Sequence, residues 1–468
     1  MGREAQAEPR SRGSWTRDWT EPVAAAFAVR LLLLAVALAH GGVGSLYRAD
    51  TLSYLEPGRS LLLHGSFVEA GLPDIARTPG YALFLAVLCL ASPIAVALVQ
   101  IVLSALSVVL VHRLALAVFR GPRIALVAAW LFAFEPVSII YSILLLSETL
   151  FLVLFLLSLV QVVEFLRSRR LLVLAAAGLW LAAATIVRPV TCYLPIALAI
   201  GLFLVLARLP GLRWKAPAVL LLSALPWLAA WQIRNRIEAG FAGFSSIQTQ
   251  NLYFFSAAEV TSRVEHRSLA DVQNDLGYND EQLFLARHPE AAQWNQAQRL
   301  QFMSTEAKRV LRAHPALFLR THFSGSMRAA FNPGSAVLLS LVGSPIDDRA
   351  FTREREEGPL RGALWVAENY PGQTAVTAAL GIILLGLYGF AVFGLVRETR
   401  FGNAPHACLW LLIGVSLYFF GVSGGAIAAA RLRLPVMPIV CVLAAAGVVR
   451  KKIDPGSRSE CEHLPGSG

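Results

Sequence analysis

Long apolar runs recur along the chain, and each is about the length of one membrane crossing. The runs Leu171–Val187 and Ala218–Ile233, for example, contain no charged residue. A helix needs about 20 such residues to cross a hydrocarbon core that is about 30 Å thick. The pattern predicts about ten transmembrane helices, near residues 22–43, 93–118, 121–141, 143–163, 171–188, 190–207, 215–233, 376–396, 405–423 and 432–449. We therefore expect an all-α polytopic membrane protein.

Basic residues flank these runs at every second boundary, which indicates how the chain is oriented. The clusters are Arg10, Arg12 and Arg17; Arg120 and Arg123; Arg167, Arg169 and Arg170; Arg208, Arg213 and Lys215; Arg397 and Arg400; and Arg450, Lys451 and Lys452. Lys and Arg are enriched on the cytoplasmic side of membrane helices. Both termini are therefore predicted to be cytoplasmic.

The apolar stretch 78–119 is about twice the length of one crossing. Two crossings there would place every later basic cluster on the opposite side. We therefore expect Pro79–Leu90 to be a short helix that lies in, or dips into, the outer interface, because apolar runs of this length are typical of such segments.

The runs and the polar segments between them predict the organisation of the chain. The expected parts are a cytoplasmic N-terminal tail (1–21), a transmembrane core (22–233) with a first extracytoplasmic loop (44–77), a long extracytoplasmic loop (234–375), C-terminal transmembrane helices (376–450) and a cytoplasmic tail (451–468). The long loop has a helical pattern interrupted at His314-Pro315, since a proline starts a helix more readily than it continues one.

Composition agrees with a membrane protein and argues against nucleic-acid binding. The chain is 56% hydrophobic and 15% charged, and its formal net charge is +11. The long loop, however, holds 15 Lys and Arg and 15 Asp and Glu, so the excess lies outside it. The five cysteines form no disulfide framework or metal-ligand spacing, and no nucleotide-binding motif is present. No motif supports a cofactor, although a divalent cation remains possible.

Two acidic residues lie close to the predicted membrane edge. Asp50 follows the first run and could act as a general base, or it could simply cap a helix over Leu52–His64. Glu148 lies a few residues inside an apolar run, where an acid is costly and is a functional hypothesis by default. The alternative for Glu148 is a hydrated position at the outer rim.

Several arginines lie on the predicted outer side, against the usual bias. Arg188 ends one run, Arg234 follows another, and Arg431 and Arg433 open the last. Each alone could extend to lipid headgroups, but the arginine fork suits phosphate oxygens, and three clusters together favour an anion site shared with Asp50. Arg30, inside the first run, is predicted to extend to the cytoplasmic interface.

Short motifs along the chain together resemble a known family. They are Asp50-Thr-Leu-Ser-Tyr54, His64-Gly-Ser-Phe67, Arg77-Thr-Pro-Gly-Tyr81, Glu135-Pro136, Ser147-Glu148, Arg188-Pro189, Pro226-Trp227, Arg234-Asn235, His314-Pro315 and Arg431-Leu-Arg-Leu-Pro435. Their order and predicted side resemble the membrane glycosyltransferases of the protein-mannosyltransferase and aminoarabinose-transferase type, over roughly residues 22–450. This family has the C-type glycosyltransferase fold and uses polyprenyl-phosphate-linked sugars.

The resemblance implies a site and a reaction. Asp50 would be the catalytic base that deprotonates an acceptor hydroxyl, which would attack the anomeric carbon with inversion. Arg188 and Arg431, together with Arg234 or Arg433, would hold the donor phosphate. Glu148, Tyr54, Arg77 and Tyr81 would orient substrate, or Glu148 would brace an arginine. Thr51 stands where the family often has a second acid, which weakens the case for a metal there.

Other functions remain open at this point. A related lipid-linked glycan ligase or polymerase would also place arginines at an outer phosphate site. A transporter or flippase is the main alternative outside enzymes, although no inverted repeat or mid-membrane polar site is evident. An inactive scaffold is a third. The expected partners are a polyprenyl-phosphate sugar donor, a protein, lipid or glycan acceptor, and membrane lipids. Frequent Ala and Arg without an Asn-X-Ser/Thr sequon suit a bacterial cytoplasmic membrane, with the site facing the periplasm or exterior.

Overall fold

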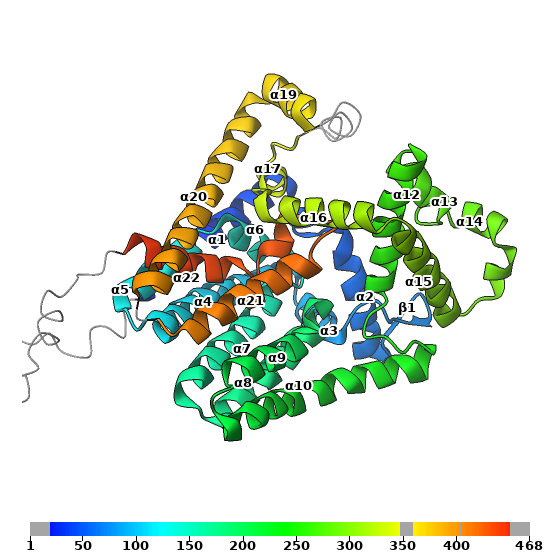
Figure 1. Ribbon diagram of the computed structural model, residues 1–468. Coiled ribbons are helices and arrows are strands. Elements are labelled where there is room, and N and C mark those ends of the chain that lie inside the picture. The colour runs from blue at the N-terminus through cyan, green and yellow to red at the C-terminus, as the bar shows by residue number, and fades with distance from the viewer. Residues whose placement is uncertain (1–18, 347–358, 403, 450–468) are drawn as a thin grey trace, which may run out of the picture.

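The structure, a computed structural model, describes residues 19–346, 359–402 and 404–449, and these are almost entirely helical. Apolar helices form a bundle on one side of the molecule, and the helices of the long loop between residues 258 and 313 lie on the other (Figure 1). The predicted C-terminal tail and nearly all of the predicted N-terminal tail lie outside the described residues.

A helix lies at each of the ten positions that the apolar runs predicted. Five are long and apolar enough to cross a membrane on their own: α1 (Thr20–Gly41), α4 (Pro93–Phe119), α7 (Glu148–Ser168), α10 (Pro210–Ala239) and α20 (Pro371–Phe401). A sixth candidate is the pair α5 (Pro122–Ala133) and α6 (Pro136–Ile143), bent by 53°. The other positions hold shorter apolar helices, α8 (Leu171–Val187), η2 (Pro189–Thr191) with α9 (Leu194–Val205), α21 (His406–Val422), and η5 (Ala430–Arg433) with α22 (Met437–Val448). By length and composition, the described residues therefore support five or six crossings, and ten remains a prediction.

The first loop folds against the bundle. It contains η1 (Val43–Leu46), α2 (Ala49–His64), and the antiparallel strands β1 (Val68–Glu69) and β2 (Leu72–Pro73), and it leads to α3 (Pro79–Cys89). Helix α3 is the short apolar helix that the sequence predicted at Pro79–Leu90. It packs closely against α2, because Gly58 leaves room for the backbone of Ala82; a Cβ at Gly58 would lie 2.2 Å from that carbonyl oxygen.

The long loop packs around a hydrophobic core that it shares with the first loop. Its elements are α11 (Ile247–Asn251), η3 (Leu252–Ala257), α12 (Ala258–Glu265), α13 (Leu269–Asp275), α14 (Glu281–Arg287), η4 (Pro289–Gln293), α15 (Gln296–Ala313), α16 (Pro315–Phe331), α17 (Ser335–Leu341) and α19 (Pro359–Asn369). Tyr253, Met303 and Leu311 are buried in this core together with Ile75 of the first loop. The shared core fixes the two loops against each other. As predicted, a new helix begins at Pro315.

Arg30 differs from the prediction. It is fully buried in α1, where it donates to Ser104 Oγ at 2.8 Å, Ser138 Oγ at 2.9 Å and the Ala133 carbonyl at 2.9 Å. The Ala133 carbonyl is free because the helix breaks between α5 and α6. A buried guanidinium with several acceptors replaces the predicted extension to the interface.

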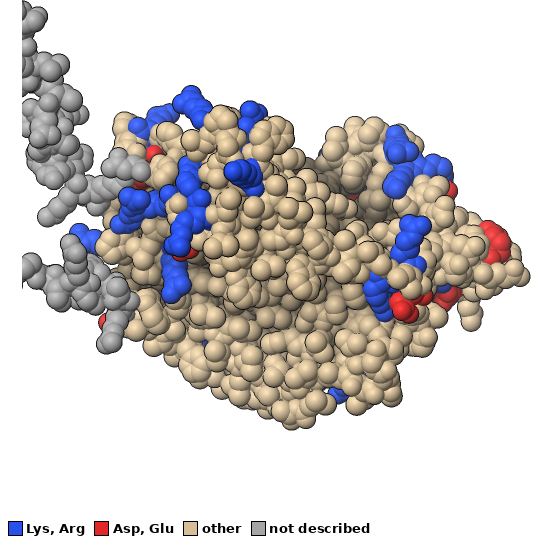
Figure 2. Space-filling view, turned by 90° about the horizontal axis from the view of Figure 1, so that it is seen from below, with Lys and Arg blue, Asp and Glu red and all other residues tan. Residues whose placement is uncertain are grey.

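One face of the molecule has the charge distribution of a membrane protein. Figure 2 shows Lys and Arg gathered at one end, mixed acidic and basic residues at the other, and a broad uncharged surface between them. Helix α10 exposes Leu222, Trp227 and Ile233. An apolar surface of this extent is typical of protein that faces lipid.

Candidate active site

A cavity of about 1260 Å³ lies between the membrane bundle and the two loops. Its lining includes Asp50, Arg77, Glu148, Arg188 and Arg431, which come from five different segments. The side of the long loop contributes Phe254 and Phe255 from the π-helical turn η3, together with Tyr278. The cavity therefore has a charged wall on the membrane side and an aromatic wall on the loop side.

Asp50 lies in the first turn of α2 and is not the helix cap that the sequence allowed as an alternative. The helix begins at Ala49 after Arg48, whose backbone N–H donates to Thr51 Oγ1 at 3.0 Å. Thr51 Oγ1 donates in turn to the Leu145 carbonyl at 3.0 Å, so this residue anchors the helix start to the bundle. The carboxylate of Asp50 is left to face the cavity.

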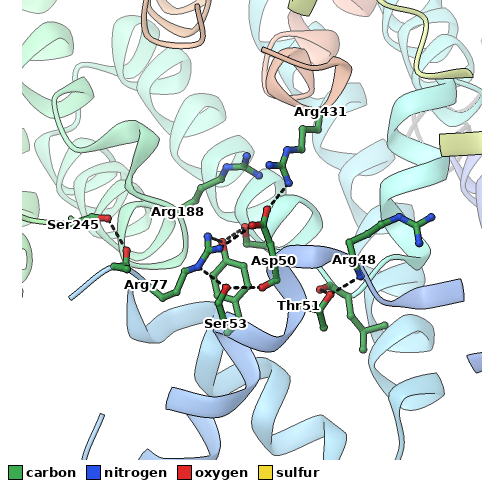
Figure 3. Close-up of polar contacts among 12 residues, drawn as sticks. Arg48, Asp50, Thr51, Ser53, Arg77, Arg188, Ser245 and Arg431 are labelled. Carbon is green, nitrogen blue, oxygen red and sulfur yellow. Dashed lines mark hydrogen bonds and ion pairs between the residues drawn. The ribbon is translucent and has the colours of Figure 1, made fainter. Parts of the chain in front are cut away.

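Two arginines hold the Asp50 carboxylate from opposite sides. Arg77 Nη2 lies 2.9 Å from Asp50 Oδ1, and Arg431 Nη1 lies 2.8 Å from Oδ2 (Figure 3). Burial alone would raise the pKa of Asp50, but the charges and hydrogen bonds of Arg431 and Arg77 outweigh it and lower the pKa to about 2. The carboxylate is therefore ionised at neutral pH.

Glu148 is buried behind this pair and braces two arginines. Its side chain is 3% exposed, which excludes the hydrated rim position. Arg188 Nη1 lies 2.6 Å from Glu148 Oε1, and Arg431 Nη1 lies 3.8 Å from the same atom. Arg188 directly follows α8, and Arg431 lies in η5, so helix ends from distant parts of the sequence meet at one acid. Arg431 thus links Glu148 to Asp50.

Glu148→Gln is expected to destabilise the protein, because Arg188 and Arg431 would lose their shared counterion. Breaking a buried ion pair by removing one partner typically costs about 3–5 kcal/mol. Thermal unfolding in detergent should show a clear drop in the midpoint. Glu164→Gln, on the same helix α7 but exposed, is the matched control. An unchanged midpoint for Glu148→Gln would contradict the bracing role.

Of the four residues expected to orient substrate, Glu148, Tyr54 and Arg77 line the cavity. Arg77 donates to Ser53 Oγ at 2.9 Å and lies over the Tyr54 ring, 4.4 Å from its centre. Tyr81 is fully buried instead, with its hydroxyl donating to Gln100 Oε1 at 2.8 Å. Its ring meets Tyr54 edge to face at 5.0 Å, so Tyr81 supports Tyr54 and does not reach the cavity.

Arg234 and Arg433, which the sequence grouped with the phosphate ligands, do not line the cavity. Arg234 donates to the carbonyls of Phe67 at 2.7 Å and Asp74 at 2.6 Å, and so holds the first loop in place. Arg433 is buried and donates to the carbonyls of Ala329 and Asn332. Both guanidinium groups are committed to backbone oxygens, a use that residue type alone does not reveal.

Sequence reasoning missed the hydroxyl groups that position the charged wall. Ser53 binds Arg77, and Ser147 Oγ lies 3.2 Å from the Tyr54 hydroxyl. Ser53 lies three residues after Asp50, and Ser147 directly precedes Glu148. This closeness to the candidate acids is the sequence signal that could have identified the two serines. The aromatic residues of η3 had no such signal. Within the described part of the chain, no group of three or more His, Cys, Asp or Glu side chains is placed to hold a metal ion.

A comparison with known protein families agrees with the family that the sequence motifs resemble. The family described as "Dolichyl-phosphate-mannose-protein mannosyltransferase" matches residues 78–233. This stretch runs from α3 into α10 and includes Glu148 and Arg188. No curated protein matches the chain significantly.

Solved structures show a weaker similarity. The archaeal oligosaccharyltransferase AglB from Archaeoglobus fulgidus, in complex with an inhibitory peptide and a dolichol-phosphate, is 12% identical with a TM-score of 0.47, covering 90% of this chain and 50% of that one. The apo form of the Archaeoglobus fulgidus oligosaccharyltransferase gives 12% identity, a TM-score of 0.45, and coverage of 92% and 51%. The chain spans about half the length of these proteins, and at TM-scores below 0.5 this likeness decides nothing further.

The family match and the motifs that surround the cavity agree with each other. The matched segment supplies two of the five charged residues of the site, and the first loop and the last helices supply the others. The chain is a helical, multi-pass membrane protein, and its residues 78–233 are similar to the dolichyl-phosphate-mannose-protein mannosyltransferases.

Proposed function

We propose that the protein transfers a sugar from a polyprenyl-phosphate carrier to an acceptor hydroxyl, with inversion at the anomeric carbon. The observation that carries the proposal is the charged wall of the cavity, where one ionised carboxylate, Asp50, lies beside Arg77, Arg188 and Arg431. A base and an anion site at one cavity wall are what such a transfer needs. The acceptor is a protein, a lipid or a glycan.

The proposed reaction gives each of these groups a role. The acceptor oxygen attacks the anomeric carbon, its proton passes to the Asp50 carboxylate, and the bond from that carbon to the phosphate oxygen breaks. The leaving polyprenyl phosphate gains negative charge as this bond breaks. Arg431 and Arg188 stabilise that charge, because both are positioned by Glu148 before the donor arrives.

Donor binding also activates the base. A carboxylate whose pKa is about 2 is a weak base, because the ideal catalytic pKa lies near the working pH. A donor phosphate would compete with Asp50 for Arg431, the partner that lowers this pKa most. The pKa of Asp50 then rises in the donor complex, and its carboxylate becomes a better proton acceptor.

This exchange predicts different pH profiles for the two rate parameters. The profile of kcat/KM reports the free enzyme, so ionised Asp50 should leave it without an acid limb above about pH 4. The profile of kcat reports the donor complex, so its acid limb should appear at higher pH. Initial rates in proteoliposomes, measured against donor concentration at each pH, test this. Coincident acid limbs would contradict release of Arg431 from Asp50.

The site is proposed to face the extracytoplasmic side of a bacterial cytoplasmic membrane. The predicted cytoplasmic cluster Arg120–Arg123 lies at the start of α5, at the opposite end of the bundle from α2 and the long loop (Figure 1). Positive residues at that end support a cavity that opens away from the cytoplasm.

Sugar transfer from a defined donor panel tests the proposed function. Purified protein in proteoliposomes is given radiolabelled polyprenyl-phosphate hexoses and pentoses together with a membrane extract as the source of acceptor. Label in a new product, with release of polyprenyl phosphate, is the expected result. Consumption of pyrophosphate-linked glycans alone would favour a ligase. Movement of intact donor between leaflets without bond cleavage would favour a flippase.

A further inference from the structure

Helix α16 (Pro315–Phe331) has the reverse of the packing that is expected of a helix in water. Most of its large apolar side chains beyond Phe318 point away from the protein: Leu319 is 66% exposed, Phe323 64% and Phe331 50%. The face against the protein is made of small residues, among them Gly325 and Ala329. A helix in water buries its large apolar residues, whereas helices in lipid pack through small residues and turn large ones outward.

Small residues let α16 approach the segment after α21 very closely. A Cβ at Gly325 would lie 2.2 Å from the Gly425 carbonyl oxygen. Ser326 Oγ donates to the Phe420 carbonyl at 3.0 Å, and a ring nitrogen of His322 lies 2.8 Å from the Gly421 carbonyl. Contacts between small residues and backbone are typical of helix packing in membranes.

Contacts with α20 show how deep α16 reaches. The Tyr388 hydroxyl donates to the Ala330 carbonyl at 2.8 Å, and the rings of Phe331 and Tyr388 meet edge to face at 5.7 Å. Thr377 Oγ1, by contrast, donates to Ser335 Oγ at 2.9 Å. Tyr388 and Thr377 are eleven positions apart on one helix, or about 16 Å at 1.5 Å per residue. The end of α16 at Ala330 therefore lies farther from the start of α20 than Ser335, the first residue of α17 (Ser335–Leu341).

Polar groups of the turn between α16 and α17 are hydrogen-bonded within the protein. Arg433 donates to the carbonyls of Ala329 and Asn332 at the end of α16. The Gly334 N–H donates to Asn332 Oδ1 at 2.8 Å, and Gly334 has a φ of +79°, which suits glycine. Irregular backbone at membrane depth is tolerated only where protein groups pair with it. Arg433 supplies that pairing here.

We propose that residues 315–341 form a re-entrant hairpin in the bilayer leaflet on the cavity side, with the stripe Leu319, Phe323, Met327 and Phe331 against lipid acyl chains. Helices α20 and α21, which both contact α16, also expose large apolar side chains, among them Leu385 and Leu417. This membrane contact does not depend on the proposed function. Two arginines, Arg320 and Arg328, also lie on the exposed side of α16. Arg328 donates to the Gly425 carbonyl at 3.2 Å.

The hairpin also separates the cavity from the bilayer. Phe318 and His322, on the same helix as the stripe, line the cavity. One face of α16 thus meets the cavity while the other meets acyl chains. In this arrangement α16 lies between the cavity and the acyl chains. The hairpin is therefore a part of the cavity wall that lipid contacts directly.

Photocrosslinking to lipid tests the proposal on the full chain. Phe323→p-benzoylphenylalanine and Phe331→p-benzoylphenylalanine are made separately, reconstituted with phospholipid that carries a radiolabelled acyl chain, and irradiated. Leu385 on the spanning helix α20 is the lipid-facing control, and exposed Val264 on α12 of the long loop is the control away from the bilayer. Size-exclusion profiles identify variants that fold like the unmodified protein.

The expected result is lipid labelling at positions 323 and 331 comparable to position 385 and at least about fivefold above position 264, because acyl chains are confined to the hydrocarbon core. Labelling at both hairpin positions no higher than at position 264 would overturn the proposal. Crosslinks from position 323 to a protein instead of lipid would overturn it as well. Loss of sugar transfer has no bearing on this readout, so failure of the proposed function and failure of the hairpin are distinguished.

Discussion

Asp50→Asn is expected to reduce sugar transfer about 100- to 10,000-fold, the usual contribution of a general base, while the protein stays folded. Asparagine keeps the size of the side chain and one oxygen for Arg77 or Arg431, but it cannot accept the acceptor proton. The measurement is the initial rate of transfer in proteoliposomes at saturating donor, with matched protein amounts.

The controls for this variant separate chemistry from folding and from charge. Glu164→Gln removes an exposed carboxylate of α7 that does not line the cavity, and it should transfer at close to the native rate. Thermal midpoints establish that both variants are folded. If Asp50→Asn transfers as fast as the native protein, Asp50 only pairs with arginines, and the base must be sought elsewhere along the cavity wall.

Much of the fold could be predicted from the sequence, because membrane helices are set by local apolar runs. Every predicted run holds a helix, and Pro79–Leu90 was correctly predicted as a separate short helix. The number of crossings is harder to obtain, since α8 and α22 are too short to be assigned by length alone. Their packing against longer helices depends on the tertiary structure.

The charged site could be predicted only in part, because arginine serves several purposes in a membrane protein. Asp50, Glu148, Arg188 and Arg431 converge, as the motif set implied. Arg433 is two residues from Arg431, yet it points into the protein and pairs with carbonyls, because η5 turns successive side chains in different directions. The sequence shows no sign of the open carbonyls at the end of α16, which arise only when the chain turns there.

Arg431→Gln is expected to lower transfer about 100- to 1000-fold, the typical effect of removing one group that stabilises developing negative charge. Glutamine can still offer a hydrogen bond to Asp50 but carries no charge for the leaving phosphate. Stability should change little, because Asp50 keeps Arg77 at 2.9 Å and Glu148 keeps Arg188 at 2.6 Å. The measurement pairs the rate of transfer with the thermal midpoint in detergent.

Arg433→Gln is the matched variant for this experiment, with the opposite expected outcome. The substitution would leave the carbonyls of Ala329 and Asn332 poorly paired, at a cost of about 1–3 kcal/mol for a buried polar group, so the midpoint should fall while transfer per folded molecule is largely kept. The two arginines are two residues apart and of the same type. A loss of transfer in Arg431→Gln and a loss of stability in Arg433→Gln would therefore assign them different roles. If Arg431→Gln instead keeps its transfer rate, or if Arg433→Gln abolishes transfer at an unchanged midpoint, the donor phosphate is held by other groups than those proposed.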